Sequence, residues 1–240
     1  MTSEGVLAVI PARYQSSRFP GKPLALIRGI PMIVRVMNWA RSIGGVSEVI
    51  VATDHRGILE TVREAGGEAV MTSESHSSGT SRISEAASGL DYDIILNIQG
   101  DEPLLPVLGV EDLIREMTED RSVEMATLAS FSGSGDELGS PDTVKVVFGA
   151  DRNALYFSRA PLRSSENGFY RHIGIYGFRK DFLMEFVRLP AGDLEKVERL
   201  EQLRALENGF RIRVVTCNSR ATGVDRPEDI KRVEKLIDKN

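Results

Sequence analysis

Cysteine is nearly absent from this sequence of 240 residues, in which the only one is Cys217. A single cysteine excludes an internal disulfide framework and a thiolate metal site, and it fits a reducing compartment. A surplus of positive charge is also missing, because 30 Lys and Arg residues face 35 Asp and Glu residues, for a formal net charge of -5. This balance excludes a uniformly basic surface for nucleic acid, so an anionic ligand must be met by a local cluster of cations.

Long apolar runs and a targeting pattern are missing as well. The run from Val6 to Ile10 is too short for a signal sequence and stops at Pro11, and Met1 to Gly5 includes no basic residue. No later run approaches the roughly 20 apolar residues that cross a bilayer. We therefore expect a cytoplasmic protein without a membrane partner.

The composition is that of an ordinary globular protein, with 41% hydrophobic and 27% charged residues. Its length suits a single domain over residues 1–240. Short apolar stretches alternate with segments of helical periodicity, which predicts an α/β fold with a mainly parallel sheet and helices on both faces. We expect strands at Val6–Ile10, Val49–Ala52, Glu68–Met71, Ile94–Ile98 and Glu124–Ala129, and helices from Pro31 to Ala40, His55 to Ala65, Thr80 to Ala87 and Val110 to Met117.

The pattern changes in the second half of the chain. After a polar stretch from Phe131 to Pro141, residues from about 143 to 179 resemble strands without helices between them, which predicts an antiparallel insert with a hairpin tip at Arg163–Gly168. The insert could cover a site or pair two subunits. Beyond it we expect a helix over Asp193–Glu207, a strand over Ile212–Thr216 and a last helix over Pro227–Ile237.

A basic loop from Pro11 to Pro23 follows the first predicted strand and carries Arg13, Arg18 and Lys22. Ligands bind at this edge of open α/β sheets, and guanidinium and ammonium groups there suit a polyphosphate. The ATPase phosphate loop is excluded, because that motif needs Gly at position 16 and Ser or Thr after Lys22. The alternative is a solvated basic loop.

Two carboxylates are candidates for holding Mg²⁺ beside such a polyphosphate. Asp101 comes just after the strand that ends at Ile98, at the same edge as the basic loop. Asp225 precedes the last helix. The alternatives are a turn residue for Asp101 and a helix N-cap for Asp225, where Glu228 would complete a capping box.

Further polar residues are ambiguous when taken alone. The stretch from His76 to Arg82 contains small hydroxyl residues, which cap helices but can also contact a base edge. His172 lies in a predicted strand, where a structural histidine is the simpler reading. Glu201 falls near the edge of a stripe formed by Leu194, Val197, Leu200, Leu203 and Leu206, and polar groups beside a buried stripe need partners or line a cavity.

Taken together, these residues resemble the 3-deoxy-manno-octulosonate (Kdo) cytidylyltransferases, or CMP-Kdo synthetases. The resemblance runs nearly end to end. Its pieces are Ile10–Arg13, Pro20–Leu24, Ala52–Asp54, Ser78–Thr80, Gln99–Pro103, Ala154–Arg159, His172–Gly177, Leu200–Arg204 and Gly223–Asp229.

The resemblance implies a Rossmann-like nucleotidyltransferase fold, a homodimer, and the reaction of CTP with Kdo to give CMP-Kdo and pyrophosphate for lipopolysaccharide synthesis. It assigns Mg²⁺ to Asp101 and Asp225, which count with Arg13 and Lys22 as catalytic. The predicted CTP-binding residues are Ala12, Arg13, Lys22, Ser78, Gly79 and Arg82, and the predicted sugar-binding residues are Gln99, Arg159, His172, Tyr176, Glu201 and Gln202.

The sequence departs from the family's usual pattern at two places. Ser81 stands where an acidic residue is usual. After Ser158-Arg159 the usual sequence continues with Ile-Pro, whereas here Ala160 is followed by Pro161-Leu162-Arg163. Two alternatives stay open at this point. One is a cytidylyltransferase for another acidic sugar, of the 8-amino-Kdo or sialic-acid type, and the other is a non-catalytic nucleotide-binding protein.

Overall fold

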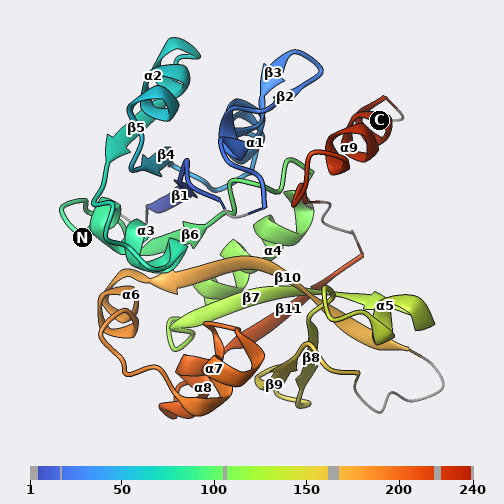
Figure 1. Ribbon diagram of the computed structural model, residues 1–240. Helices are drawn as coiled ribbons and strands as arrows, with labels where there is room; N and C mark the ends of the chain where they lie inside the picture. Colours follow the sequence, from blue (N-terminus) through green and yellow to red (C-terminus); the bar gives the residue numbers. More distant parts are fainter. Residues whose placement is uncertain (1–4, 17, 105–106, 162–167, 219–222, 239–240) are drawn as a thin grey trace. The chain divides into compact units, whose positions relative to one another are not determined.

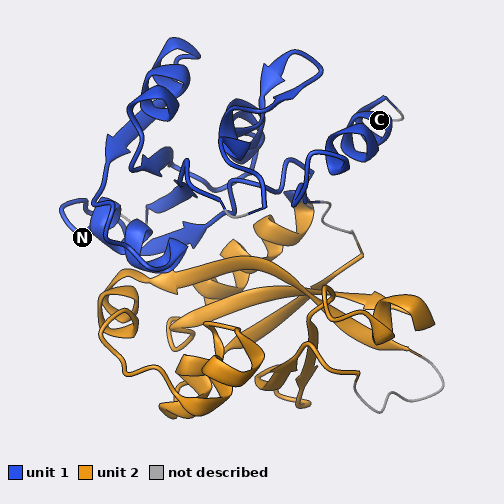
Figure 2. Cartoon of the chain, in the orientation of Figure 1, with its two compact units in different colours: residues 1–107, 221–240 blue, residues 108–220 orange. Residues whose placement is uncertain are grey.

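The computed structural model describes residues 5–16, 18–104, 107–161, 168–218 and 223–238. The chain divides into two compact units (Figure 2). Unit 1 comprises residues 1–107 and 221–240, and unit 2 comprises residues 108–220. The prediction of a single domain stays a prediction. No described helix is long and apolar enough to cross a membrane.

Unit 1 is built on four parallel strands in the order β6, β1, β4, β5. They are β1 (Val6–Ala12), β4 (Glu48–Thr53), β5 (Glu68–Met71) and β6 (Ile94–Asn97). Every residue of β6 is buried, and β1 is buried except at Pro11, as the continuous apolar runs predict for strands covered on both faces. Because the strands are parallel, their carboxyl ends lie at one edge of the sheet.

Helices cover both faces of this sheet (Figure 1), with α1 (Met32–Arg41) and α2 (Arg56–Glu64) on one side and α3 (Gly79–Ala87) on the other. Helix α1 begins directly after Pro31, and α2 is followed by Gly66 at a φ of +73°, a conformation that favours glycine. These predicted helices are confirmed within one or two residues.

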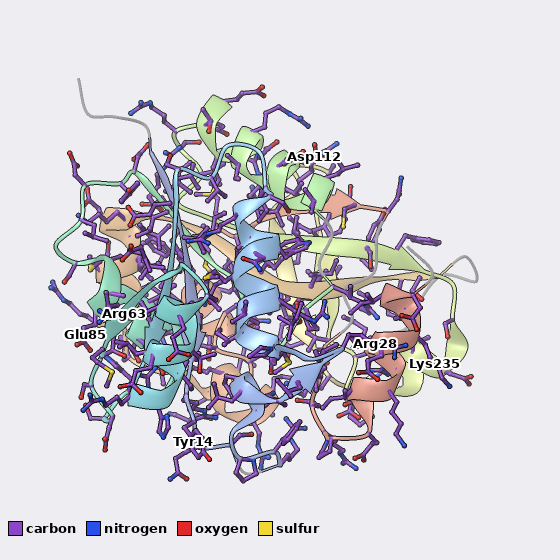
Figure 3. The ribbon with its side chains drawn as sticks, turned by 90° about the horizontal axis from the view of Figure 1, so that it is seen from above. Tyr14, Arg28, Arg63, Glu85, Asp112 and Lys235 are labelled. Carbon is purple, nitrogen blue, oxygen red and sulfur yellow. The ribbon has the colours of Figure 1, made fainter. Side chains whose placement is uncertain are left out.

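Smaller elements complete unit 1. The short helix η1 (Lys22–Leu24) follows the basic loop, and strands β2 (Leu26–Ile27) and β3 (Ile30–Pro31) form a hairpin that sequence reasoning missed. Helix α9 (Asp229–Ile237) packs against this hairpin, where Glu234 accepts a hydrogen bond of 2.9 Å from the Arg28 backbone N–H. Figure 3 shows Arg28 beside the helix that carries Lys235.

Unit 2 contains the antiparallel part of the fold. Strand β7 (Met125–Ser132) pairs in parallel with β11 (Arg213–Cys217) and antiparallel with β10 (Phe169–Arg179). Strands β8 (Lys145–Phe148) and β9 (Ala154–Ser158) pair antiparallel with each other, and β8 also pairs with the start of β10. The strands predicted between about 143 and 179 are therefore confirmed. Of the predicted hairpin tip at 163–168, all but Gly168 lies outside the described residues.

The helices of unit 2 differ more from the predictions. Helix α4 (Val107–Glu119) was predicted, whereas α5 (Gly135–Gly139) lies in a stretch expected to be a loop and α6 (Lys180–Phe186) was missed. The single helix expected over 193–207 is wrong. It is split into α7 (Asp193–Glu198) and α8 (Leu203–Glu207), because Arg199 adopts a left-handed conformation with φ +54°.

The split changes which side chains of the predicted apolar stripe are buried. Leu200 and Leu203 are buried, but Val197 is 78% exposed and Leu194 is 41% exposed. The predicted class is nevertheless confirmed, because the chain is a mixed α/β protein with a mainly parallel sheet, helices around it and an antiparallel addition.

Candidate active site

A cavity of about 260 Å³ opens at the carboxyl edge of the parallel sheet of unit 1. It is lined by residues that follow β1, by the N-terminal turn of α3, by the loop after β6 and by the segment before α9. All nine of the predicted site residues that belong to unit 1 line it, namely Ala12, Arg13, Lys22, Ser78, Gly79, Arg82, Gln99, Asp101 and Asp225. The structure therefore brings together residues that lie more than 200 positions apart.

Lys22 connects the two predicted metal-binding carboxylates. Its Nζ lies 2.5 Å from Asp101 Oδ2 and 3.9 Å from Asp225 Oδ1, and it donates a hydrogen bond of 3.1 Å to the carbonyl of Val224. Only 13% of the Lys22 side chain is exposed. Arg18 Nη1 lies 3.1 Å from the other oxygen of Asp225. The two carboxylates thus converge on one position that a cation already occupies.

The prediction that Asp225 could be a helix N-cap is wrong. Helix α9 begins later, with Glu228 at its N-cap position and no side chain capping it. Instead, Asp229 Oδ2 accepts hydrogen bonds from the backbone N–H groups of Asp225 and Arg226, which fixes the segment before the helix. The Asp225 carboxylate is thereby directed at Arg18 and Lys22.

Backbone features hold these loops in place. A Cβ atom on Gly100 would lie 2.9 Å from the carbonyl oxygen of Pro11, so only glycine lets the loop after β6 approach the end of β1 so closely. The Val224 N–H donates a 2.8 Å hydrogen bond to the carbonyl of Asp101, which ties the segment before α9 to the same loop. The position of Asp225 follows from this contact rather than from sequence spacing.

Arg82 lines the cavity, but its guanidinium is anchored in the protein and only 4% of its side chain is exposed. It forms an ion pair of 2.6 Å with Asp54 and donates a 2.5 Å hydrogen bond to the hydroxyl of Thr72. Asp54 also accepts a hydrogen bond of 3.4 Å from the backbone N–H of Tyr14. Arg82 and Asp54 therefore connect α3 to the basic loop.

Tyr14 lies on the basic loop (Figure 3) and stacks on His55, with ring centroids 4.1 Å apart and an interplanar angle of 17°. His55 is the residue before α2, so the stack connects the basic loop to the start of that helix. Asp54 and Tyr14 were both missed as contributors to the site. The signal that could have found Asp54 is its position after β4, at the same strand edge as Asp101.

The departure at Ser81 has a structural role. Ser78 is the N-cap of α3, and its hydroxyl accepts a hydrogen bond from the Ser81 N–H. The Ser81 hydroxyl lies 3.1 Å from His76 Nδ1, and the other ring nitrogen of His76 is hydrogen-bonded to Glu85. The hydrogen bond from His76, followed by one from the Ser73 backbone, lowers the pKa of the Glu85 carboxyl. Side-chain contacts thus fasten the segment before α3 to the helix.

The charges around the cavity favour an anionic ligand. Four basic side chains line it, those of Arg13, Arg18, Lys22 and Arg82, against the two carboxylates of Asp101 and Asp225. Two carboxylates are a typical protein contribution to an Mg²⁺ site whose other ligands are substrate phosphates and water. Among the described residues there is no group of three or more histidine, cysteine or acidic side chains that could hold a metal ion.

The other five predicted sugar-binding residues belong to unit 2. His172 is in β10, and its Nε2 lies 2.9 Å from the hydroxyl of Thr127. That hydroxyl also lies 2.7 Å from the carbonyl of Ile175, which can only accept. The Thr127 hydrogen therefore goes to Ile175, and His172 donates from Nε2. Its Nδ1 is left as a hydrogen-bond acceptor.

Burial, with a smaller contribution from the charge of Arg159, lowers the pKa of His172 from 6.5 to about 3. The imidazole is therefore neutral at physiological pH. The ring of Tyr176 lies 5.5 Å from that of His172, and Phe157 packs edge-on at 5.1 Å. The structure brings Arg159, His172 and Tyr176 into one group.

Glu201 and Gln202 lie in the turn between α7 and α8. Gln202 is only 4% exposed, and its Nε2 has no hydrogen-bond partner among the residues that the structure describes. A buried amide without a partner is costly unless a ligand or water satisfies it. The Glu201 carboxylate lies 3.8 Å from Arg204, whose bidentate partner is Glu195 at 2.6 and 2.8 Å.

Comparison with known proteins places the chain in a family. Residues 7–213 match the family described as Cytidylyltransferase. The chain is 46% identical to the 3-deoxy-manno-octulosonate cytidylyltransferase of Geobacter metallireducens, over 96% of this chain and 97% of the relative. It is 47% identical to the protein of that name from Syntrophobacter fumaroxidans, over 97% and 96% of the two chains.

Solved structures agree. A CMP:2-keto-3-deoxy-manno-octonic acid synthetase in complex with CTP matches with a TM-score of 0.93 and 41% identity, over 98% of this chain and 99% of the other. A thymidylyltransferase from Bacillus anthracis, with 14% identity and a TM-score of 0.68 over 97% and 95% of the chains, shares the fold alone. The chain is therefore a nucleotidyltransferase that belongs to the 3-deoxy-manno-octulosonate cytidylyltransferase family.

Proposed function

We propose that this protein transfers the cytidylyl group of CTP to Kdo, as the step that activates the sugar for lipopolysaccharide synthesis. The anomeric hydroxyl of Kdo attacks the α-phosphorus of CTP. A bond forms between that oxygen and phosphorus, the bond to the β-phosphate oxygen breaks, and pyrophosphate leaves. The hydroxyl proton is released to solvent or to the leaving group, and the products are CMP-Kdo and pyrophosphate.

One observation carries the nucleotide half of this proposal. Nine residues predicted for CTP, sugar and metal from different parts of the sequence line one cavity in unit 1, in which basic side chains outnumber acidic ones. The solved structure that is 41% identical in sequence to this chain was determined in complex with CTP. Arg13 and Lys22 suit the triphosphate, and the turn at Ser78 and Gly79 suits the nucleoside.

The chemistry asks the protein mainly for positioning and for neutralisation of charge. Lys22 is nearly buried, and its ammonium is fixed by hydrogen bonds to Asp101 and to the Val224 carbonyl. Once it contacts the phosphates, this cation stabilises the negative charge that builds up on the leaving pyrophosphate. No side chain is assigned here as a general base.

The residues present fit the Mg²⁺ ion that the resemblance implies. Asp101 and Asp225 converge from two segments, and hard carboxylate oxygens are the ligands that Mg²⁺ prefers. When bound, the ion would offset phosphate charge and polarise the reacting oxygens. Lys22 Nζ lies 2.5 Å from Asp101 and 3.9 Å from Asp225, so we expect its ammonium to exchange one carboxylate contact for a phosphate contact when CTP and metal bind.

In unit 2, Arg159 suits the carboxylate of Kdo, because a guanidinium and a carboxylate form a charge-assisted pair. Neutral His172 and the buried amide of Gln202 suit its hydroxyl groups, with His172 Nδ1 as an acceptor and Gln202 Nε2 as a donor. The homodimeric state implied by the resemblance stays a prediction.

The experiment is a pyrophosphate-release assay over CTP, UTP, ATP and GTP, each combined with Kdo, 8-amino-Kdo and a sialic acid, with Mg²⁺ or with excess chelator. We expect release only from CTP with Kdo and only with the metal. Full activity in chelator would refute the metal assignment. Preference for another acidic sugar would refute the substrate assignment while leaving the cytidylyltransferase reaction in place.

A further inference from the structure

The side chain and backbone of Arg159, just after β9, are held at four points. Its backbone N–H donates to Glu198 Oε2 at 2.7 Å, and its Nε donates to the Glu198 carbonyl at 3.1 Å. Its Nη1 donates to the carbonyl of Pro141 at 3.1 Å, and its own carbonyl accepts a 2.8 Å hydrogen bond from Lys145 Nζ. Such a set of contacts fixes the plane of the guanidinium.

The anchoring leaves part of the guanidinium available. A guanidinium has five N–H groups, and the described contacts use one on Nε and one on Nη1. Both N–H groups of Nη2 have no partner among the residues that the structure describes. The charge of Arg159 contributes to the lowered pKa of His172, which places the guanidinium near this predicted sugar-binding residue.

Lys145 is unusual because it is fully buried, with 0% exposure. Its ammonium donates to the carbonyls of Ser140 and Arg159, at 2.7 and 2.8 Å. Burial lowers the pKa of Lys145, and the Arg159 charge adds to this, whereas Glu198 opposes it. Burying an ammonium is costly, and an apolar residue of similar size would satisfy packing alone. An apolar residue could not donate the two hydrogen bonds of Lys145. These bonds connect Ser140, before β8, to Arg159, at the end of β9.

Glu198 is the second anchor and depends on the break between α7 and α8. Its carboxylate accepts hydrogen bonds from the hydroxyls of Tyr156 and Ser158, at 3.2 and 3.0 Å, besides the Arg159 N–H. The next residue, Arg199, has φ +54°, which costs a non-glycine residue on the order of 1 kcal/mol. Such strain persists where surrounding contacts fix it. Because α7 ends at Arg199, both the carboxylate and the carbonyl of Glu198 can accept hydrogen bonds from Arg159 at the end of β9.

We propose that Lys145 and Glu198 are positioning residues that orient the Arg159 guanidinium toward the carboxylate of the sugar-acid substrate. This inference rests on the proposed function, through the assignment of Arg159 to that carboxylate. A bidentate pair needs its guanidinium plane fixed in advance, because an arginine free to rotate loses conformational entropy on binding. The anchors act on Arg159 and not on the nucleotide, so their removal weakens sugar binding selectively.

The test compares steady-state kinetics of Glu198→Gln and Lys145→Met with those of the unaltered protein. We expect each variant to raise the KM for Kdo by about 10-fold, which corresponds to losing one charge-assisted hydrogen bond, with an unchanged KM for CTP. Asp193→Asn is the matched control, because this carboxylate is 98% exposed in the same helix. It should leave both constants unchanged.

A double-mutant cycle separates positioning from a general structural role. In an Arg159→Ala background, Glu198→Gln should raise the KM for Kdo no further, because the anchor acts through Arg159. Additive effects of the two substitutions, or an equal rise in both KM values, would overturn the inference. So would a Kdo KM unchanged in Arg159→Ala. If the unaltered protein does not convert CTP and Kdo at all, the proposed function itself fails, and that outcome is distinguished from the others by the first measurement.

Discussion

His172 offers a prediction about stability that depends on burial rather than on catalysis. In the folded protein its pKa is about 3, chiefly because the ring is buried and secondarily because Arg159 is near. In the unfolded chain its pKa is near 6.5. Below pH 6.5 the unfolded state therefore binds a proton that the folded state does not. The contribution of His172 to the free energy of unfolding is therefore fully present above pH 6.5, and it is lost as the pH decreases toward 3.

The size of this loss in unfolding free energy is set by the one proton that the unfolded state binds and the folded state does not. Each pH unit within this window lowers the free energy of unfolding by roughly 1.4 kcal/mol, so the loss between pH 7 and pH 5 is about 2 kcal/mol. The perturbation is His172→Gln, whose amide can still donate to the Thr127 hydroxyl but cannot titrate. The variant should lack this part of the pH dependence.

The assay is urea unfolding at half-unit steps from pH 7 to pH 5, a range chosen above the ordinary pKa values of carboxyl groups. The quantity compared is the slope of the unfolding free energy against pH, not its absolute value, so a destabilised variant remains informative. Tyr176→Phe is the control, since it alters the neighbouring ring without removing a group that titrates in this range. Equal slopes for the unaltered protein and His172→Gln would refute the assignment of a His172 that stays neutral in the folded protein.

Three further predictions concern unit 1. Lys22→Ala should lower both kcat and kcat/KM for pyrophosphate release, on the order of 100-fold. Unchanged kinetics would contradict the assignment of Lys22 to the triphosphate. Arg82→Met should lower the urea-unfolding free energy by about 3 kcal/mol, because it removes the ion-pair partner of Asp54, whose side chain is only 13% exposed. Arg56→Met is the control, and because its side chain is 87% exposed it should change this free energy by less than about 0.5 kcal/mol. Asp101→Asn should abolish the Mg²⁺ dependence of CTP binding in calorimetry, and an unaltered dependence would exclude this carboxylate as a ligand.

The parallel half of the fold could be predicted because its signals are local. A strand covered on both faces appears as a continuous apolar run, as in β1 and β6. Parallel strands place their carboxyl ends at one edge, so the proximity of Asp101 to the basic loop followed from the predicted sheet alone. The β2–β3 hairpin had one sequence signal, because Gly29 suits the positive φ that the two-residue turn requires, but strands of two residues show no periodicity.

The misses share a cause, which is that tertiary contacts override a local pattern. The sequence around Asp225 fits a capping box, yet α9 begins only at Asp229, whose carboxylate binds the Asp225 N–H while the Asp225 side chain faces Lys22. The residues from 193 to 207 have helical periodicity, but the contacts of Glu198 with β9 hold the break at Arg199. Lys145 carried no sequence signal, because a lysine in a strand gives no indication that it is buried.

In the reaction that we propose for this protein, the anomeric hydroxyl of Kdo displaces pyrophosphate from CTP. The most direct measurement is ³¹P NMR of the complete reaction with CTP, Kdo and Mg²⁺, beside the same reaction with a 2-deoxy analogue of Kdo that lacks this hydroxyl. We expect one new phosphodiester signal and pyrophosphate in equal amounts with Kdo, and neither with the analogue. Pyrophosphate release that is equal with both sugars, accompanied by CMP instead of a phosphodiester, would contradict it.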